Sequence, residues 1–126
     1  MQINTFDIDG VIYMGKGLRG VRPDPDDIII TGRSIEEAKA TLTMLYQQGI
    51  FNQVFFNPIK YNEKTRVSSG LHKARTIEML IESGYDIMFH FEDDPIQIET
   101  IKNYCKKVHV IAIDSPTEKE NVRAEL

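Results

Sequence analysis

Short apolar runs alternate with amphipathic helical patterns along this chain, and this alternation restricts the folds open to it. Runs rich in Ile, Val or Phe recur between turn-forming or charged residues, as is typical of strands buried on both faces of a sheet. They cover residues 2–8, 27–30, 53–56, 86–91 and 107–113. Alternating strands and helices favour right-handed βαβ crossovers. The sequence therefore predicts an α/β three-layer sandwich with a parallel sheet of about five strands.

Three stretches carry apolar residues at spacings of three and four, the pattern of helices with one buried face. Ser34 with Glu37 forms a capping box, and Asp94 is a cap followed by a proline in the first turn. Glycines stop the first two helices. The predicted helices are residues 34–48, residues 73–83 and the segment opened by Asp94, with buried faces formed by Ile35, Ala38, Leu42, Leu45, Ala74, Ile77, Leu80, Ile81, Ile98, Ile101 and Cys105.

The segments between these elements are short. Residues 14–26, with three glycines and two prolines, predict a flap hairpin over the strand ends. Residues 57–72 predict a polar loop, and the polar stretch from Ser115 on predicts a surface tail over residues 115–126. With 126 residues, the chain is expected to form a single domain spanning residues 1–126.

Composition narrows the possible environments. A net charge of −4 gives no overall attraction to nucleic acid or to an anionic membrane. The single cysteine, Cys105, fits a reducing compartment. No apolar run is long enough to cross a bilayer, and the first residues do not have the pattern of a signal peptide. We therefore expect a cytoplasmic protein without a membrane partner.

Two aspartates close the first apolar run, and Gly10 follows at once. Carboxylates at the tip of a buried strand are costly unless a cation or a proton-transfer role compensates. Asp7 is placed to attack phosphorus, and Asp9 to protonate the leaving oxygen and then activate water. Mg²⁺ would offset the charge of carboxylates and phosphate. The plainer alternative is a turn in which both aspartates bind backbone amides.

Two further signals suit a phosphate site. Thr31, Gly32 and Arg33 follow the second strand, where a hydroxyl and free amides at a helix N-terminus can cradle phosphate, although capping alone would explain them. Lys73 opens the next predicted helix and can neutralise phosphate. Lys64 is the competing candidate, and a solvated lysine is the plainer alternative.

Three acids, Glu92, Asp93 and Asp94, follow the fourth predicted strand. Asp93 is the favoured metal ligand, Asp94 is a helix cap that can also serve the metal, and the role of Glu92 stays open. In parallel sheets the working site lies at the carboxyl ends of the strands. We therefore expect the carboxylates of Asp7 and Asp93 to lie within about a dozen ångströms of each other, close enough for one hydrated Mg²⁺.

The remaining sequence features contribute less to a functional interpretation. Residues 15–20 fit a glycine-rich dinucleotide pattern, but no helix start follows, so that reading is rejected. His90 and His109 lie in predicted strands and are interpreted as packed or edge residues. His72 could reach the rim of the site, and Cys105 is expected to be a buried small hydrophobe.

The motifs Asp7-Ile8-Asp9-Gly10-Val11, Thr31-Gly32-Arg33, Lys73 and Glu92-Asp93-Asp94-Pro95 together resemble the four motifs of the haloacid dehalogenase-like (HAD) superfamily. The resemblance implies a Rossmann-like sheet in the order 5-4-1-2-3 and Mg²⁺ as cofactor. It implies these roles: Asp7 as nucleophile, Asp9 as acid/base, Thr31, Gly32, Arg33 and Lys73 on phosphate, and Asp7, Asp9 (through its main-chain carbonyl), Asp93 and Asp94 around the metal.

Members of this superfamily usually carry a cap domain, and the short intervals here indicate a capless one. An open cleft suits large substrates, and the phosphatase half of polynucleotide kinase/phosphatases has a similar motif set. Water exclusion would then come from the substrate or from a neighbouring subunit. Lys16, Arg19, Arg22, Lys60 and Lys64 could form a basic rim for a nucleotide or polynucleotide end, although solvated loop charges are the preferred interpretation.

The sequence thus favours a Mg²⁺-dependent phosphomonoester phosphatase that acts through an aspartyl-phosphate. The alternative is a phosphate- or nucleotide-binding module without turnover, although two retained acids, Asp7 and Asp9, argue for catalysis. A receiver domain fits poorly, because receivers place their acids and lysine after different strands.

Overall fold

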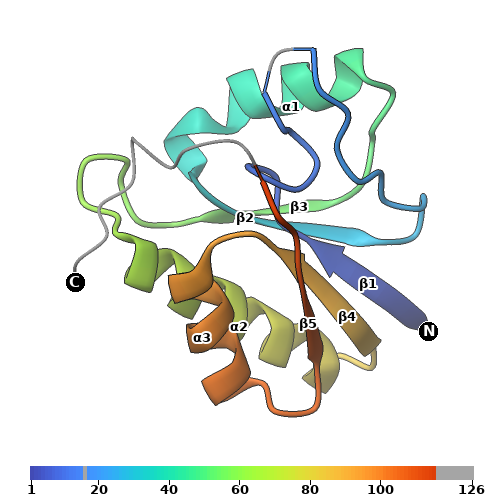
Figure 1. Cartoon of the computed structure of the whole chain (residues 1–126), viewed down its shortest axis with the longest axis vertical. Helices are drawn as coiled ribbons and strands as arrows, with labels where there is room; N and C mark the ends of the chain where they lie inside the picture. Colours follow the sequence, from blue (N-terminus) through green and yellow to red (C-terminus); the bar gives the residue numbers. More distant parts are fainter. Residues whose placement is uncertain (16, 116–126) are drawn as a thin grey trace.

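A five-stranded, all-parallel sheet forms the centre of the molecule in the computed structural model, which describes residues 1–15 and 17–115. The strand order is β3-β2-β1-β4-β5, which read from the β5 edge is 5-4-1-2-3. Figure 1 shows the strands running side by side with their carboxyl ends at one edge. The strands are β1 (Gln2–Phe6), β2 (Ile28–Ser34), β3 (Val54–Asn57), β4 (Asp86–Glu92) and β5 (His109–Ala112).

Helices cover both faces of this sheet. The 3₁₀ helix η1 (Ile35–Glu37) leads into α1 (Ala38–Gln47) on one face, and α2 (Arg66–Glu82) and α3 (Pro95–Tyr104) pack together on the other (Figure 1). The α/β class, the parallel sheet and the helix-covered faces expected from the sequence are confirmed. No helix within the described ranges has the length and apolar character that crossing a bilayer requires.

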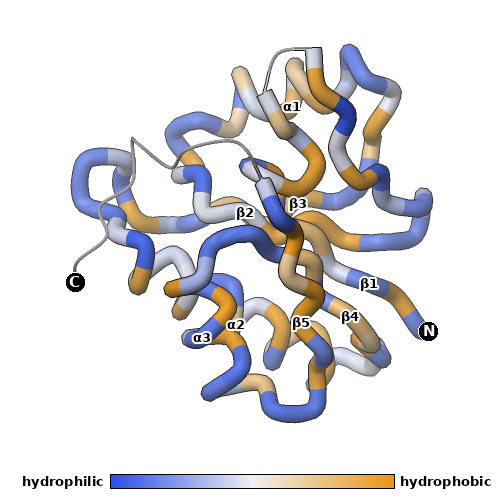
Figure 2. The backbone as a smooth tube through the Cα atoms, in the orientation of Figure 1, coloured by the Kyte–Doolittle hydropathy of each residue, from blue (hydrophilic) through white to orange (hydrophobic). Residues whose placement is uncertain are grey.

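Two apolar clusters, one on each face, hold the layers together. Successive side chains of a strand point to opposite faces, so β2 supplies Ile28 and Ile30 to one cluster and Ile29 to the other. Figure 2 shows hydrophobic residues along the central strands and hydrophilic residues along the outer loops. The α2/α3 cluster contains Ile3, Ile28, Ile30, Ala74, Ile77, Leu80, Ile87, Ile101, Cys105 and Val108; the α1 cluster contains Phe6, Ile8, Val11, Ile12, Ile29, Leu45 and Ile50.

Several predicted boundaries were wrong, and the second strand is the most important case. β2 continues to Ser34, so Thr31, Gly32 and Arg33 belong to the strand rather than to a turn after it. The extension occurs because Ser34 still pairs with Asn57 of β3, beyond a shift of register after Ile30. The first strand is shorter than predicted and ends at Phe6.

The helix that carries Lys73 also begins earlier than predicted. α2 starts at Arg66, so the second half of the expected polar loop is helical and Lys73 lies in the middle of the helix. Thr65 caps it by accepting from the Ser68 amide, while the Ser68 hydroxyl accepts from the Thr65 amide. This reciprocal pair has serine where the usual sequence signature has glutamate or glutamine, which is why the start was missed.

The predicted caps of the other two helices agree with the structure. The capping box of Ser34 and Glu37 and the cap by Asp94 with Pro95 in the first turn are confirmed. The expected burial was wrong for Ile35 and Ile81, which are 55% and 41% exposed. Ile35 lies in the 3₁₀ turn, whose tighter winding moves its side chain off the apolar face of the α-helix that follows.

The predicted flap hairpin is reduced to an isolated antiparallel bridge between Tyr13 and Arg19. Val21 anchors the flap, because its side chain packs against the α1 cluster and its amide donates to the Val11 carbonyl. The predicted surface tail covers residues 115–126, and beyond Ser115 it lies outside the residues that the structure describes.

Candidate functional site

Three acids from two neighbouring strands meet at the carboxyl edge of the sheet. Asp7 directly follows β1, Glu92 ends β4, and Asp93 comes next. Because β1 and β4 are parallel neighbours with Phe6 opposite Phe91, their ends coincide. One carboxylate oxygen from each of Asp7, Glu92 and Asp93 lies within 4.8 Å of the others. The expected proximity of Asp7 and Asp93 is therefore met.

Lys73 reaches this cluster from α2, across the face of the sheet. Its ammonium group lies 2.9 Å from Asp7 Oδ1 and 2.8 Å from Glu92 Oε1, and the residue is 1% exposed. Lys73 reaches the acids from the middle of its helix, which lies against the sheet, and not from the first turn as predicted. A buried ammonium between two carboxylates neutralises only part of their charge, since Asp7, Glu92, Asp93 and Lys73 together carry a net charge of −2.

Glu92 is fully buried, with its two oxygens in different surroundings. Oε1 accepts hydrogen bonds from Lys73 Nζ and His90 Nε2. Oε2 is buried with no hydrogen-bond partner among the residues that the structure describes. A buried, ionised oxygen without a donor is expensive and suits a cation ligand. The hard carboxylate oxygens of Asp7, Glu92 and Asp93 are a donor set that Mg²⁺ favours.

Gly10 makes room for Asp93 in this cluster. A Cβ atom built on Gly10 would overlap the Asp93 carboxylate, and Gly10 has a φ of +85°, a conformation that glycine adopts without strain. The glycine that follows the two N-terminal aspartates is therefore required both by its backbone and by the carboxylate packed against it.

Asp9 points to a different partner. Both of its oxygens accept from Arg33, at 2.9 Å from Nε and 2.7 Å from Nη2, and Arg33 also donates to the Thr41 hydroxyl. This bidentate pair raises the pKa of Arg33 and holds Asp9 as a carboxylate. With side chains 34% and 20% exposed, Asp9 and Arg33 lie nearer the surface than Asp7, which is 2% exposed.

Asp94 forms an ion pair with a structural role. Arg66 donates to both of its oxygens at 2.8 and 2.6 Å, and the same carboxylate accepts from the amide of Ile96 and from Gln97. Asp94 therefore caps α3 and ties it to α2. The acids brought together at the cluster are Asp7, Glu92 and Asp93, so Glu92 stands where the sequence had suggested Asp94.

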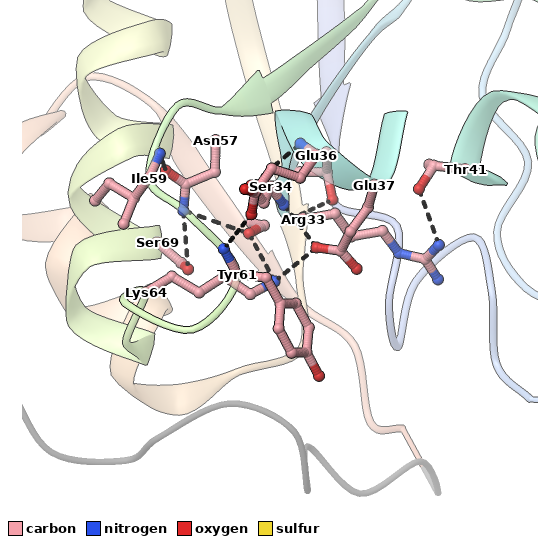
Figure 3. Close-up of polar contacts among 12 residues, drawn as sticks. Arg33, Ser34, Glu36, Glu37, Thr41, Asn57, Ile59, Tyr61, Lys64 and Ser69 are labelled. Atoms are coloured by element: carbon pink, nitrogen blue, oxygen red, sulfur yellow. Dashed lines mark hydrogen bonds and ion pairs between the residues drawn. The ribbon is translucent and has the colours of Figure 1, made fainter. Parts of the chain in front are cut away.

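Thr31 and Gly32 lie beside the cluster in backbone that is already hydrogen-bonded. The buried Thr31 hydroxyl accepts from the Arg33 amide at 3.0 Å. The Gly32 carbonyl accepts from Lys64 at 3.1 Å and from Asn57 at 3.3 Å, contacts that bring the loop after β3 against the end of β2 (Figure 3). The helix after β2 is capped by Ser34 as predicted, but Thr31 and Gly32 lie within β2 and not at the helix N-terminus.

Lys64 is buried and serves this loop. It is 6% exposed, lies 3.2 Å from Glu37 Oε2, and its ammonium group stands 5.1 Å from the centre of the Tyr61 ring (Figure 3). Its interpretation as a solvated rim charge was wrong. Between the two lysines considered for the site, Lys73 is the one in contact with Asp7.

No family model, curated protein or solved structure matches this chain.

His90 is the functional neighbour that sequence reasoning missed. It was expected to be packed, and it is fully buried, but it also joins Thr5 to Glu92. Burial, with a smaller contribution from Lys73, lowers the pKa of His90 to about 3 and that of His72 to about 4, so both rings are neutral at pH 7. The spacing of His90 and Glu92, two residues apart in a strand, was the available signal, because it puts both on one face.

Proposed function

We propose that this chain is a Mg²⁺-dependent phosphomonoester phosphatase of the HAD-like type, with a Rossmann-like fold and Asp7 as nucleophile. The observation that carries the proposal is the meeting of Asp7, Lys73, Glu92 and Asp93 at one sheet edge, with carboxylate oxygens within 4.8 Å of one another. Three of the four motifs that resemble that superfamily contribute residues to this cluster from distant parts of the sequence, and the fourth, Thr31-Gly32-Arg33, lies at the end of β2.

The residues present fit a divalent cation. Asp7, Glu92 and Asp93 would hold it, since these carboxylates with Lys73 carry a net charge of −2 and Glu92 Oε2 is buried without a donor in the described part of the chain. Bound there, Mg²⁺ supplies positive charge against phosphate oxygens. Arginines hold Asp94 and the side chain of Asp9, so we assign neither side chain to the cation: Asp94 caps α3 and Asp9 serves as acid and base.

Lys73 prepares Asp7 for attack. The ammonium at 2.9 Å keeps the Asp7 carboxylate ionised and oriented. An Asp7 oxygen bonds to phosphorus and the bond to the leaving oxygen breaks, while Asp9, released from Arg33 and protonated from solvent, gives that oxygen its proton. Asp9 then takes a proton from water, whose oxygen attacks the phosphorus of the aspartyl-phosphate, which releases phosphate and restores Asp7.

Asp9 must first leave Arg33 to act as an acid. Phosphate oxygens carry more charge than a carboxylate and compete for the same guanidinium. Arg33, 20% exposed at its side chain, is therefore the first phosphate contact in this mechanism, with Thr31 and Gly32 beside it. Because Asp7 is 2% exposed, the phosphoryl group reaches it only as neighbouring groups move aside.

For the substrate we propose a nucleotide or polynucleotide end, acted on in a reducing, cytoplasmic compartment. The support is the exposure of two cations, Arg19 and Lys60, in the loops after β1 and β3; Arg22 is also exposed but lies against Gly49, just past the C-terminal end of α1. A panel of mononucleotides, sugar phosphates and DNA 3′-phosphates tests this choice, with the DNA end expected to give the highest kcat/KM.

The activity itself is tested by phosphate release from an aryl phosphate. We expect release that requires Mg²⁺, is abolished by chelation, and falls at least about a thousandfold in Asp7→Asn. Asp26→Asn, which alters an exposed acid of the flap, is the matched control and should retain full activity. Release that persists in Asp7→Asn would contradict the nucleophile assignment.

A second candidate is a phosphate- or nucleotide-binding module without turnover. The observation that favours it is the bidentate pairing of Asp9 with Arg33 together with the burial of Asp7. Calorimetry that finds tight binding of a phosphoester, with no hydrolysis over hours in the presence of Mg²⁺, would favour this module over the phosphatase.

A further inference from the structure

A chain of buried polar side chains runs through the sheet behind the acid cluster. Thr5 on β1 and His90 on β4 are opposite each other in the register of the two strands, and both are 0% exposed. The Thr5 hydroxyl lies 2.8 Å from His90 Nδ1, and His90 Nε2 lies 3.1 Å from Glu92 Oε1. A buried histidine in the middle of a strand is costly, because its ring nitrogens lose their hydration and an apolar residue at position 90 would avoid this cost.

The direction of these hydrogen bonds follows from Glu92. A carboxylate only accepts, so His90 must carry its proton on Nε2 and donate it to Oε1. Nδ1 of the neutral ring is then an acceptor, and the Thr5 hydroxyl donates to it. Thr5 thereby selects the tautomer in which His90 presents a donor to Glu92.

This donor is not needed to balance the charge of Glu92. Lys73 already supplies an ammonium at 2.8 Å to the same oxygen, Oε1. The contact from His90 instead adds a second direction of restraint on Oε1, which fixes the rotation of the carboxylate. Oε2, buried and without a hydrogen-bond partner among the described residues, is thereby left for the cluster with Asp7 and Asp93.

We propose that His90, oriented by Thr5, is a positioning residue that holds Glu92 Oε2 as a ligand for the divalent cation. The inference rests on the proposed function, since it concerns the same cation site. Outer hydrogen-bond partners of metal ligands commonly contribute 10- to 100-fold to metal affinity. The same magnitude is expected for His90, without any contact between His90 and substrate.

The test compares two substitutions of nearly equal size. The Gln side chain in His90→Gln can still donate to Glu92, whereas the Met side chain in His90→Met cannot. We measure Mg²⁺ and Mn²⁺ affinity by titration calorimetry in the absence of substrate. His90→Met should weaken binding about 10- to 100-fold, and His90→Gln should recover most of that loss. Thr5→Val, which removes the hydroxyl but keeps the shape, should weaken it by a smaller factor.

Controls separate positioning from loss of stability. Ile29→Val removes a buried methylene from the α1 cluster, on the face of the sheet opposite α2, and should lower stability while leaving cation affinity unchanged. Equal affinities for wild type, His90→Met and Thr5→Val would overturn the positioning role. If His90→Met fails to fold, Thr5→Val decides the question, and unchanged affinity there overturns the role.

The same titrations distinguish failure of the His90 inference from failure of the proposed function. Binding by wild type that Glu92→Gln abolishes, combined with no effect of the His90 and Thr5 substitutions, refutes only the present inference. Absence of any cation binding by wild type at millimolar Mg²⁺ or Mn²⁺ refutes the cation site and the phosphatase together.

Discussion

Replacing Lys73 by methionine tests the electrostatics of the site most directly. Methionine has a similar length and is apolar, so Lys73→Met removes the ammonium while roughly keeping the packing. The change leaves Asp7 and Glu92, which are 2% and 0% exposed, without the cation that lies between them.

The expected cost follows from the geometry. Two carboxylate charges no more than 4.8 Å apart repel each other by at least about 3.5 kcal/mol at an effective dielectric constant of about 20. Breaking a buried ion pair by removing one partner typically costs about 3–5 kcal/mol, because a charge is left buried and uncompensated. We therefore expect Lys73→Met to lower the free energy of unfolding by about 3–5 kcal/mol at pH 7 without metal.

Urea unfolding followed by far-ultraviolet circular dichroism is the suitable assay, since the chain contains no tryptophan. With a typical urea dependence of about 1–3 kcal/mol per molar, the midpoint should fall by roughly 2 M. Lys39→Met, which alters an exposed lysine of α1, is the control and should stay within about 0.5 kcal/mol of wild type.

A double variant gives a second test of the same electrostatic argument. Lys73→Met combined with Glu92→Gln removes one of the two stranded charges and should be more stable than Lys73→Met alone. A loss below about 1 kcal/mol in Lys73→Met, the range of solvated surface pairs, would refute the argument that these charges are buried and coupled.

Two other perturbations probe the surroundings of the site. Burial lowers the pKa of His72 to about 4 from an ordinary value near 6.5, so the unfolded chain binds this proton first and stability falls as pH drops from 6.5 toward 4. In His72→Gln, about 2 kcal/mol of the wild-type loss between pH 7 and pH 5 should disappear from urea unfolding curves, and identical losses would contradict the burial of a neutral ring. Gly10→Ala should abolish Mg²⁺ binding by calorimetry because its Cβ displaces Asp93, whereas Gly17→Ala, at a φ of +81° with open space in the described structure, should bind normally.

The fold was predictable because its signals are local and repeated. Short apolar runs located the strands and helical apolar patterns located the helices, and parallel strands necessarily bring their carboxyl ends to one edge. That rule was enough to place Asp7 near Asp93 from sequence alone. Lys73 was selected correctly over Lys64 as the lysine in contact with Asp7, although its place in the helix was not.

The errors arose where a long-range partner decides the outcome. Asp94 was expected at the metal because nothing local identifies Arg66, 28 residues away, as its partner. Glu92 was left open because alternation at the end of a strand does not fix which residue points inward. Likewise, Lys64 was assigned to solvent, but its ammonium group donates to the Gly32 carbonyl, 32 residues away, a contact that exists only once β2 and β3 are paired.

Arginines pair with two of the acids at this edge. The acids of the two motifs are Asp7, Asp9, Glu92, Asp93 and Asp94. Arg33 and Arg66 each bind one carboxylate bidentately, and a guanidinium stays charged at any physiological pH, so Asp9 and Asp94 are neutralised locally. Lys73 supplies a single charge to the remaining three, which leaves the excess of two negative charges that a divalent cation matches. The same charge count predicts how substitutions of Arg66 change the local charge. Arg66→Met would leave Asp94 without its guanidinium partner and increase the negative charge near the cluster. Arg66→Lys would restore the positive charge, but a lysine makes only a point contact and would not restore the bidentate tie between α2 and α3.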